Sequence, residues 1–405
     1  MSIHLDPDKC LACTTCVVHC PVAEATPAFL GPRMIGPAFE RFRLLGIVED
    51  DSLKYCANCK NCEIACPQNV PVATINMLAR MAQCQEIPPS FRDWIVAHGE
   101  VLARGLKYFP AWLKNMGTHL SLMRTLLDWI GIHKDCPMPN FAKTAFRDHL
   151  PRLSQKGFAK SVAFFPGCYI NYYDPGTGFD LVWLLNQAGY RVFVPKDFVC
   201  CGIPLISGGF EKDARDNTRT NLRVLAELNA QKIPVISACP SCRLMLTREI
   251  GEFFPELMPK EKISIDDAQS FLLKCIATGE LDIKTAHNSS VNISAIYHAP
   301  CHLRAQGAGL PALELLSYFP DIAICEANAG CCGISGSYGF KKEKYAIAQS
   351  VGARLFQRIT TSGRPLVASE CGTCRLQIAQ ATKKPATHPL TLVRAALQGR
   401  PLTLG

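Results

Sequence analysis

The chain has 405 residues, of which 48% are hydrophobic and 19% charged, and it contains 22 cysteines. This apolar content excludes an intrinsically disordered chain, and the length suffices for two or three domains with buried cores. The first residues lack the basic and apolar segments of a secretory signal, and no uninterrupted run of about 18 apolar residues predicts a transmembrane helix. We therefore expect a reducing compartment, where closely spaced cysteines are more typical of metal ligands than of disulfides.

The N-terminal part, residues 1–85, contains the same cysteine run twice. The runs are Cys10, Cys13, Cys16, Cys20 and Cys56, Cys59, Cys62, Cys66, each followed by proline. This spacing is typical of bacterial ferredoxins, in which the fourth cysteine of each run binds the other cluster. The pattern predicts one [4Fe-4S] cluster on Cys10, Cys13, Cys16, Cys66 and a second on Cys56, Cys59, Cys62, Cys20. A pair of zinc sites is the alternative, although zinc sites usually lack the proline. The long segment between the runs resembles the helical ferredoxin module of succinate and fumarate reductases, which implies electron transfer.

Residues 86–160 are poor in cysteine and carry apolar residues at helical spacing. The pattern predicts amphipathic helices that connect the two neighbouring parts of the chain. The alternative is a surface that docks a partner protein or lies in the membrane interface. In that case Arg104, Lys107, Lys114 and Arg124 would face lipid phosphates.

The remainder of the chain is an internal repeat with bounds at about 161–285 and 286–405. Each copy alternates apolar strands with helices, which predicts βαβ units and a parallel sheet. In the first copy Cys168, Cys200-Cys201-Gly202 and Cys239-x2-Cys242 follow strands in turn. In the second copy the corresponding residues are Cys301, Cys331-Cys332-Gly333 and Cys371-x2-Cys374. Adjacent cysteines suit an extended cluster better than one tetrahedral zinc ion, and a vicinal disulfide is the alternative for each pair.

This repeat resembles the CCG cysteine-rich domain family, which includes heterodisulfide reductase and the iron-sulfur subunit of glycolate oxidase. The resemblance implies up to two noncubane [4Fe-4S] clusters, one in each copy. Carried over by position, their ligands are Cys168, Cys200, Cys201, Cys239 and Cys242, and then Cys301, Cys331, Cys332, Cys371 and Cys374. The expected fold is α+β overall, with a helical two-cluster ferredoxin module followed by a duplicated α/β domain pair.

The likeness extends to residues other than cysteine, in the segments 53–67 (LKYCANCKNCEIACP), 200–206 (CCGIPLI), 297–302 (YHAPCH) and 331–343 (CCGISGSYGFKKE). These segments resemble the iron-sulfur subunits of anaerobic glycerol-3-phosphate dehydrogenases. The resemblance implies an electron path from a flavin subunit through this chain to membrane quinone, at the cytoplasmic face of the inner membrane. No flavin or nicotinamide motif is present in the chain itself.

Two other functions are open from the sequence. One is the iron-sulfur subunit of a glycolate or lactate oxidase, and the other is a heterodisulfide-type thiol/disulfide reductase. His298 and His302 flank Cys301 and are candidates for a proton relay, or for hydrogen bonds to cluster sulfur. The formal charge of +9 does not predict a nucleic-acid partner, because four bound anionic clusters would bring the protein near neutrality.

Overall fold

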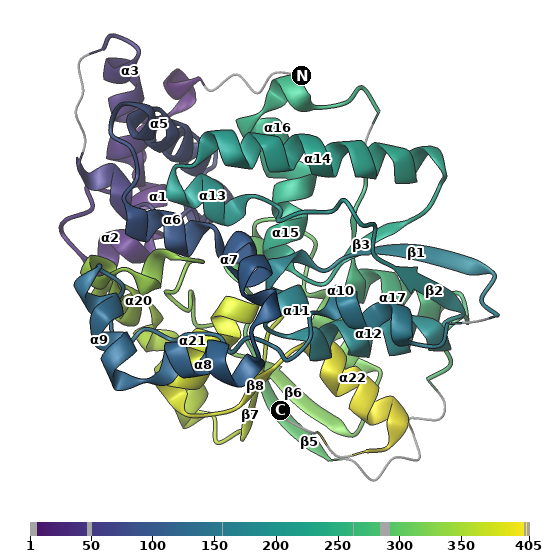
Figure 1. Ribbon diagram of the computed structural model, residues 1–405. Coiled ribbons are helices and arrows are strands. Elements are labelled where there is room, and N and C mark those ends of the chain that lie inside the picture. The colour runs from purple at the N-terminus through teal and green to yellow at the C-terminus, as the bar shows by residue number, and fades with distance from the viewer. Residues whose placement is uncertain are drawn as a thin grey trace.

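The computed structural model describes residues 6–46, 51–155, 157–261, 263–283, 292–400 and 402. An N-terminal helical module, a set of connecting helices and two α/β units follow one another along the chain (Figure 1). The predicted α+β class with a duplicated α/β pair is confirmed.

The helices of the N-terminal module and the connector are mostly short. The module contains α1 (Thr15–Val18), α2 (Pro21–Ala25), α3 (Phe39–Arg43), α4 (Asn61–Ile64) and α5 (Val72–Glu86). The connector contains α6 (Phe91–Ala97), α7 (Gly99–Gly105), α8 (Ala111–His119), α9 (Ser121–Trp129) and α10 (Phe146–His149). Ser90 and Asp93 form a capping box at the start of α6, which explains why this helix begins directly after the two prolines.

Each α/β unit is built on a four-stranded parallel sheet. The first has β1 (Lys160–Phe165), β2 (Tyr190–Phe193), β3 (Val235–Ser237) and β4 (Asp266–Asp267), in the order β2-β1-β3-β4. The second has β5 (Ile293–Tyr297), β6 (Ile322–Glu326), β7 (Leu366–Ala368) and β8 (Ala386–Thr387), in the order β6-β5-β7-β8. The two orders are equivalent, so the sequence repeat is a structural duplication.

Helices cover these sheets. In the first unit they are α11 (Gly167–Tyr172), α12 (Pro175–Gln187), α13 (Ile203–Gly208), α14 (Glu211–Ala230), α15 (Pro240–Leu244), α16 (Ile250–Phe253) and α17 (Ala268–Ala277). In the second unit they are α18 (Cys301–Arg304), α19 (Pro311–Ser317), α20 (Lys342–Thr361), α21 (Gly372–Thr382) and α22 (Pro389–Gln398). The sequence pattern did not reveal β4 or β8, because each of these strands is only two residues long, and it also missed the helices that follow them, α17 and α22.

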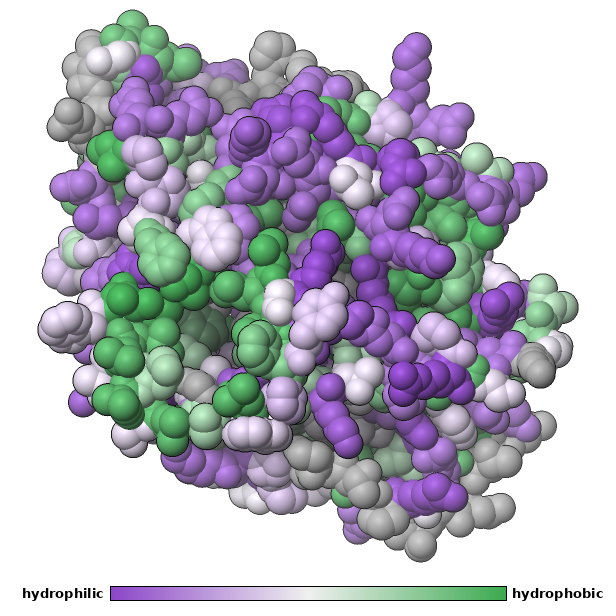
Figure 2. All heavy atoms as spheres, viewed as in Figure 1, coloured by the Kyte–Doolittle hydropathy of each residue, from purple (hydrophilic) through white to green (hydrophobic). Residues whose placement is uncertain are grey.

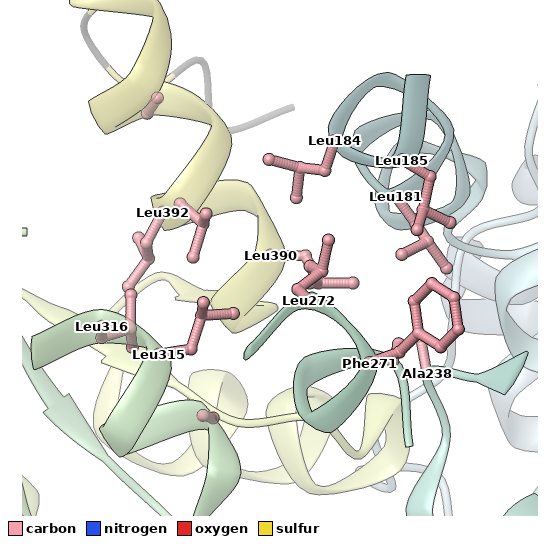
Figure 3. Packing of buried hydrophobic residues seen from close by; sticks show 14 of the residues in the cluster. Leu181, Leu184, Leu185, Ala238, Phe271, Leu272, Leu315, Leu316, Leu390 and Leu392 are labelled. Atoms are coloured by element: carbon pink, nitrogen blue, oxygen red, sulfur yellow. The ribbon is translucent and has the colours of Figure 1, made fainter. Parts of the chain in front are cut away.

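One continuous apolar core joins the two units. Leucines of α12, α19 and α22 meet Phe271 and Leu272 of α17 between the sheets (Figure 3). Leu184, Leu315 and Leu390 are fully buried there. Because each unit covers part of the other, the pair behaves as a single body that fixes the relative position of the two cysteine groups.

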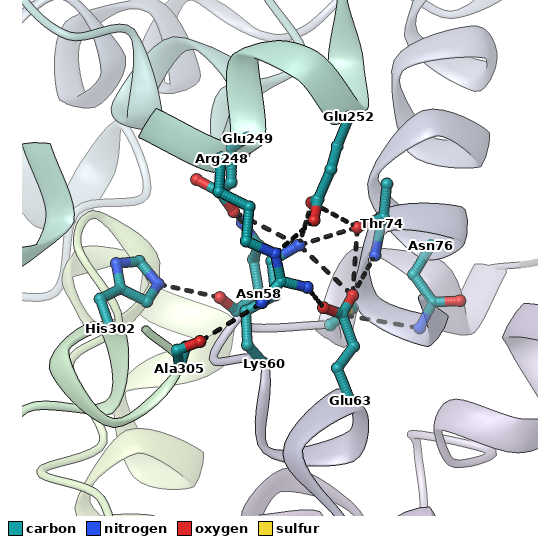
Figure 4. A network of polar contacts seen from close by, with 11 residues as sticks. Asn58, Lys60, Glu63, Thr74, Asn76, Arg248, Glu249, Glu252, His302 and Ala305 are labelled. Carbon is teal, nitrogen blue, oxygen red and sulfur yellow. Dashed lines mark hydrogen bonds and ion pairs between the residues drawn. The ribbon is translucent and has the colours of Figure 1, made fainter. Parts of the chain in front are cut away.

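A buried ammonium group locks the N-terminal module onto the first unit. Lys60 is 0% exposed, and its Nζ lies 2.7 Å from Glu252, 3.3 Å from Glu63 and 3.5 Å from Glu249 (Figure 4). The Nζ also donates to Thr74 Oγ1 at 2.8 Å. Burial alone would lower the pKa of Lys60, but the surrounding carboxylates outweigh it and raise that pKa. The lysine is therefore charged, and it sits between two cysteines of the second run.

Further polar contacts extend this lock to the second unit. Arg248 binds both Glu63 and Glu252 at 2.6 Å. The Asn58 side chain donates to Glu249 at 3.1 Å, while its backbone carbonyl accepts from His302 Nε2 at 3.0 Å (Figure 4). The turn that carries the second cysteine run is thus held by both α/β units at once.

We expect Lys60→Met to destabilise the protein by about 3 kcal/mol or more, because it leaves buried carboxylates without their central counter-charge. Lys54→Met is the matched control, since the Lys54 side chain is half exposed. The thermal unfolding midpoint of anaerobically prepared holoprotein measures the difference. Equal midpoints for the two variants would show that the buried ion cluster does not hold the modules together.

Candidate iron-sulfur centres

The described part of the chain includes all 22 cysteines, and none of them is in a disulfide. Eighteen of these cysteines belong to the predicted ligand groups, which we call set 1 to set 4. Set 1 is Cys10, Cys13, Cys16 and Cys66; set 2 is Cys20, Cys56, Cys59 and Cys62. Set 3 is Cys168, Cys200, Cys201, Cys239 and Cys242; set 4 is Cys301, Cys331, Cys332, Cys371 and Cys374. Neither adjacent pair forms the vicinal disulfide considered as an alternative.

Set 1 combines three cysteines of the first run with the last cysteine of the second. All four line one small pocket together with Val70 and Val72. Burial, followed by the nearby charges of Cys10 and Cys66, raises the pKa of Cys16. The Val70 N–H donates to Cys66 Sγ at 3.3 Å. The fold therefore brings together the four residues that the spacing predicted, including the exchanged one.

Set 2 is the complementary group and is more deeply buried. Burial raises the pKa of Cys20 to about 11, with Cys56 adding to the effect. Burial also raises the pKa of Cys62, which lies near Cys59, Cys56 and Cys20. The Asn76 side chain on α5 donates to Cys56 Sγ at 3.7 Å. Asn76 was not found from the sequence, because no local pattern places an amide on α5 beside a cysteine twenty residues earlier.

Set 3 gathers at the carboxyl ends of β1, β2 and β3. Thiol hydrogen bonds link Cys168 to Cys200, Cys200 to Cys201, Cys201 to Cys242, and Cys242 to Cys239. Hydrogen bonds from Cys200 and Cys242 lower the pKa of Cys201 to about 6. The five sulfurs thus form one continuous group, as expected where parallel strands end at the same edge of a sheet.

Set 4 repeats this arrangement at the ends of β5, β6 and β7. The sulfurs of Cys332 and Cys374 lie 3.1 Å apart, and the Gly333 N–H donates to Cys331 Sγ at 3.4 Å. Gly333 has φ = +85°, and a β carbon there would lie 1.9 Å from the Ala348 carbonyl oxygen. The glycine of this motif therefore serves close packing against α20 as well as the turn.

Helix N-termini surround sets 3 and 4. Cys239 and Cys371 are the N-cap residues of α15 and α21, and α18 begins at Cys301. The free N–H groups at these positions favour negative charge. A group of five closely spaced cysteines at such positions is suited to an anionic iron-sulfur cluster, and the donor set fits.

The two candidate histidines have different environments. His298 is 3% exposed, and one of its ring nitrogens, Cys332 Sγ and Cys374 Sγ all lie within 4.8 Å of one another. Burial lowers the pKa of His298 to about 4, and its Nε2 has no hydrogen-bond partner among the described residues. A neutral imidazole with one unused nitrogen beside set 4 fits a hydrogen bond to a bound sulfide.

The hydrogen bonds of His302, by contrast, do not favour a proton-relay role. Its Nε2 donates to the Asn58 carbonyl, and its Nδ1 lies 2.9 Å from Ser241 Oγ. Both ring nitrogens therefore connect the second unit to the N-terminal module and to the first unit.

The four sets form a row. Cys59 of set 2 lies within electrostatic range of Cys331 and Cys301 of set 4. Cys239 of set 3 in turn lies near Cys371 of set 4. Set 1 and set 2 are joined by the exchange of Cys20 and Cys66 between the runs. The order in space is thus set 1, set 2, set 4, set 3, which differs from the order along the chain.

The remaining four cysteines, Cys84, Cys136, Cys275 and Cys325, lie outside these sets. Cys275 belongs to the core between the units, and Cys136 is fully buried within the connector. Cys84 packs closely against Gly209. Cys325 packs against the core of the second unit.

Comparisons with known families identify the N-terminal module and the two α/β units. Residues 6–70 match the 4Fe-4S dicluster domain, and residues 162–247 and 295–379 match the Cysteine-rich domain. Together these matches make the chain an iron-sulfur protein.

Several known proteins are similar over long stretches. The C subunit of anaerobic glycerol-3-phosphate dehydrogenase from Escherichia coli K12 is 35% identical over 395 residues, covering 96% of this chain and 98% of that protein. The B subunit of fumarate reductase (CoM/CoB) from Methanothermobacter marburgensis is 28% identical, over 93% of this chain and 68% of the relative. Lactate utilization protein A of Halalkalibacterium halodurans is 26% identical, over 54% of this chain and 87% of the relative. With the two domain types in this order and 35% identity over almost its whole length, the chain belongs to the family of the anaerobic glycerol-3-phosphate dehydrogenase C subunits.

Proposed function

We propose that the chain is the iron-sulfur electron-transfer subunit of an anaerobic sn-glycerol-3-phosphate dehydrogenase complex. It would receive electrons from a flavin-containing subunit and pass them toward membrane quinone. The row of four cysteine sets carries this proposal, because neighbouring sets lie close enough together to form a continuous path. The similarity to the Escherichia coli C subunit supports glycerol 3-phosphate as the source of these electrons.

The ligand assignment follows the sets. Sets 1 and 2 would each hold a cubane [4Fe-4S] cluster, and sets 3 and 4 would each hold a noncubane [4Fe-4S] cluster. Bound there, such clusters supply one-electron transfer. The protein contributes hydrogen bonds to sulfur from Asn76 and from the Val70 and Gly333 N–H groups. His298, whose Nε2 has no partner among the described residues, would donate another to a bound sulfide. These bonds and the burial of sets 2 to 4 are the means by which a protein sets a cluster's reduction potential.

The overall redox chemistry balances between donor and acceptor. Oxidation of a secondary alcohol to a ketone releases two electrons and two protons. A quinone that becomes a quinol takes up the same number of each. This chain would carry only the electrons, since its family resemblance implies that flavin chemistry belongs to a separate subunit.

Two other functions are also candidates. Lactate utilization protein A matches just over half of the chain, so the iron-sulfur subunit of a lactate or glycolate oxidase is the second candidate. A disulfide reductase is the third, because the same paired-cysteine domains occur in that enzyme class.

We propose that the connector holds the complex at the cytoplasmic face of the inner membrane. No helix in the described ranges is long and apolar enough to cross a membrane. Large apolar side chains nevertheless project from α8 and α9, including Trp112 (67% exposed), Leu122 (74%) and Trp129 (89%). Figure 2 shows hydrophobic atoms gathered over these helices. Such a surface is typical of helices that lie in the membrane interface.

The basic residues expected to face lipid phosphates are bound within the protein instead. Arg104 pairs with Glu100, Lys107 pairs with Asp148, and the Arg124 guanidinium donates to the Cys136 carbonyl at 2.6 Å. Lys114 lies over the Phe141 ring and near the Ala142 carbonyl. The proposed membrane contact therefore depends on apolar burial more than on charge.

Iron and acid-labile sulfide analysis tests the ligand assignment. We expect about sixteen irons per chain in the anaerobically purified protein. Cys201→Ala and Cys332→Ala should each lower this by about four irons, since each removes one ligand of a different four-iron cluster. Cys325→Ala is the control and should keep the full content. About eight irons in the unchanged protein would limit the clusters to sets 1 and 2, and stoichiometric zinc would refute the assignment.

The donor and acceptor can be tested on the complex co-purified with its flavin subunit. We expect glycerol 3-phosphate, but not lactate or glycolate, to reduce a soluble quinone analogue. With reduced viologen as the electron donor, the isolated chain should not cleave any of a panel of disulfides. Reduction by lactate would favour the second candidate, and disulfide turnover by the isolated chain would favour the third.

Membrane attachment can be measured by sedimentation with liposomes. The holoprotein should sediment with them, and a Trp112→Ser/Trp129→Ser double variant should lose most of this binding because it removes two large apolar contacts. Binding should persist at high salt, since the nearby basic side chains are already paired. Phe42→Ser is a matched control, because Phe42 is exposed on α3 away from this surface. Binding that disappears in salt, or that is equal in all variants, would contradict the proposal.

A further inference from the structure

A large cavity lies between the connector and the two α/β units. Its volume is about 590 Å³, and most of its surface is apolar. Helices α6, α7, α8 and α9 form one wall, and residues from both α/β units form the other. The apolar lining includes Ile95, Leu102, Leu113, Leu127, Phe340 and Leu376. Cavities of this size and polarity are typical of sites for small molecules that contain rings.

The inner end of the cavity reaches set 3. Cys168 and Cys200 line it, together with Tyr169 and Tyr173, and Thr373 of the second unit completes this end. The cavity therefore adjoins the last set in the row, at the opposite end of the row from set 1. A molecule held here would contact the ligands of set 3 at van der Waals distance.

The two charged residues that line the cavity are already engaged. The Glu100 carboxylate accepts a hydrogen bond from the Cys200 N–H at 2.5 Å and pairs with Arg104 at 3.3 Å. Lys114 interacts with the Phe141 ring. A phosphate or carboxylate ligand would thus meet the fixed Glu100 carboxylate, and the one lysine among these lining residues lies near the Phe141 ring and the Ala142 carbonyl. The lining selects an uncharged molecule.

The mouth of the cavity opens on the apolar surface of the connector. Phe109 and Met123 both line the cavity and are exposed to solvent. Figure 2 shows a hollow in the same face, beside the hydrophobic atoms over α8 and α9. The apolar surface and the apolar interior are continuous, so a molecule with a long hydrocarbon tail could hold its ring inside while the tail crosses α8 and α9.

We propose that this cavity binds the ring of a lipophilic quinone next to Cys168 and Cys200. The inference rests on the proposed function, in which quinone is the acceptor, and adds where the quinone lies. The Tyr173 hydroxyl lies 3.8 Å from the position that a β carbon on Gly99 would occupy, so it faces this wall of the cavity. It provides a hydrogen-bond donor for a quinone carbonyl. Tyr173 is a positioning residue in this proposal.

Helix α7 offers a matched pair of substitutions, because it begins and ends with glycine. Gly99 lines the cavity, and a β carbon there would meet only the Tyr173 hydroxyl within 4 Å. Gly105 lies outside the cavity and would meet nothing within 4 Å. Neither glycine has a positive φ, and leucine favours a helix more than glycine does, so both variants should fold. Gly99→Leu fills the cavity, whereas Gly105→Leu makes the same chemical change outside it.

The experiment is equilibrium dialysis of the holoprotein with menadione, a naphthoquinone without a tail. We expect Gly99→Leu to weaken binding at least tenfold, Gly99→Ala to weaken it less, and Gly105→Leu to leave it unchanged. Iron content and the visible absorption of the clusters should be the same in all of these proteins. An unchanged affinity of Gly99→Leu for menadione would overturn the proposed location. If the complex of this variant with the flavin subunit still reduced quinone, the proposed function would stand. Absence of both menadione binding and quinone reduction in the unchanged protein would refute the function itself.

Discussion

The structure depends on one geometric constraint, which is that parallel strands end at a common edge. In each α/β unit three strands deliver cysteines to that edge from segments far apart in the sequence. The interlocked core of α12, α17, α19 and α22 holds the two units together, so the two edges cannot move independently. Cys239 and Cys371 are close for this reason, although each belongs to a different copy of the repeat.

A second constraint acts on the turn between Cys56 and Cys62. This turn carries Lys60, whose ammonium group would be unfavourable in the interior without the carboxylates of Glu249 and Glu252. Because these carboxylates come from the first unit, charge neutralisation and domain docking are the same event. His302 and Ser335 of the second unit bind the carbonyls of Asn58 and Ala57 in the same turn. The row of sets is continuous because both units hold this one turn.

The structure brings together the cysteines that the sequence grouped, because the spacing within each run and the order of the motifs in each repeat are visible in the sequence. It also predicted the repeat, because strands and helices leave their own periodicities. The order of the row was not predictable, as it depends on Cys59 lying within electrostatic range of Cys331, far away in the sequence. The different environments of His298 and His302 were equally hidden, because both flank the same cysteine. The partner of Arg124 was hidden for a similar reason, since it is a backbone carbonyl supplied by the fold.

The exchange of Cys20 and Cys66 between the two runs has a consequence for how the protein is made. Neither run by itself supplies four sulfurs to one set, so residues 10–20 cannot complete a site before residues 56–66 have been synthesised and folded against them. A chain folded with one run misplaced would lack both set 1 and set 2 at once. The geometry of either set therefore requires that both runs are present and folded against each other.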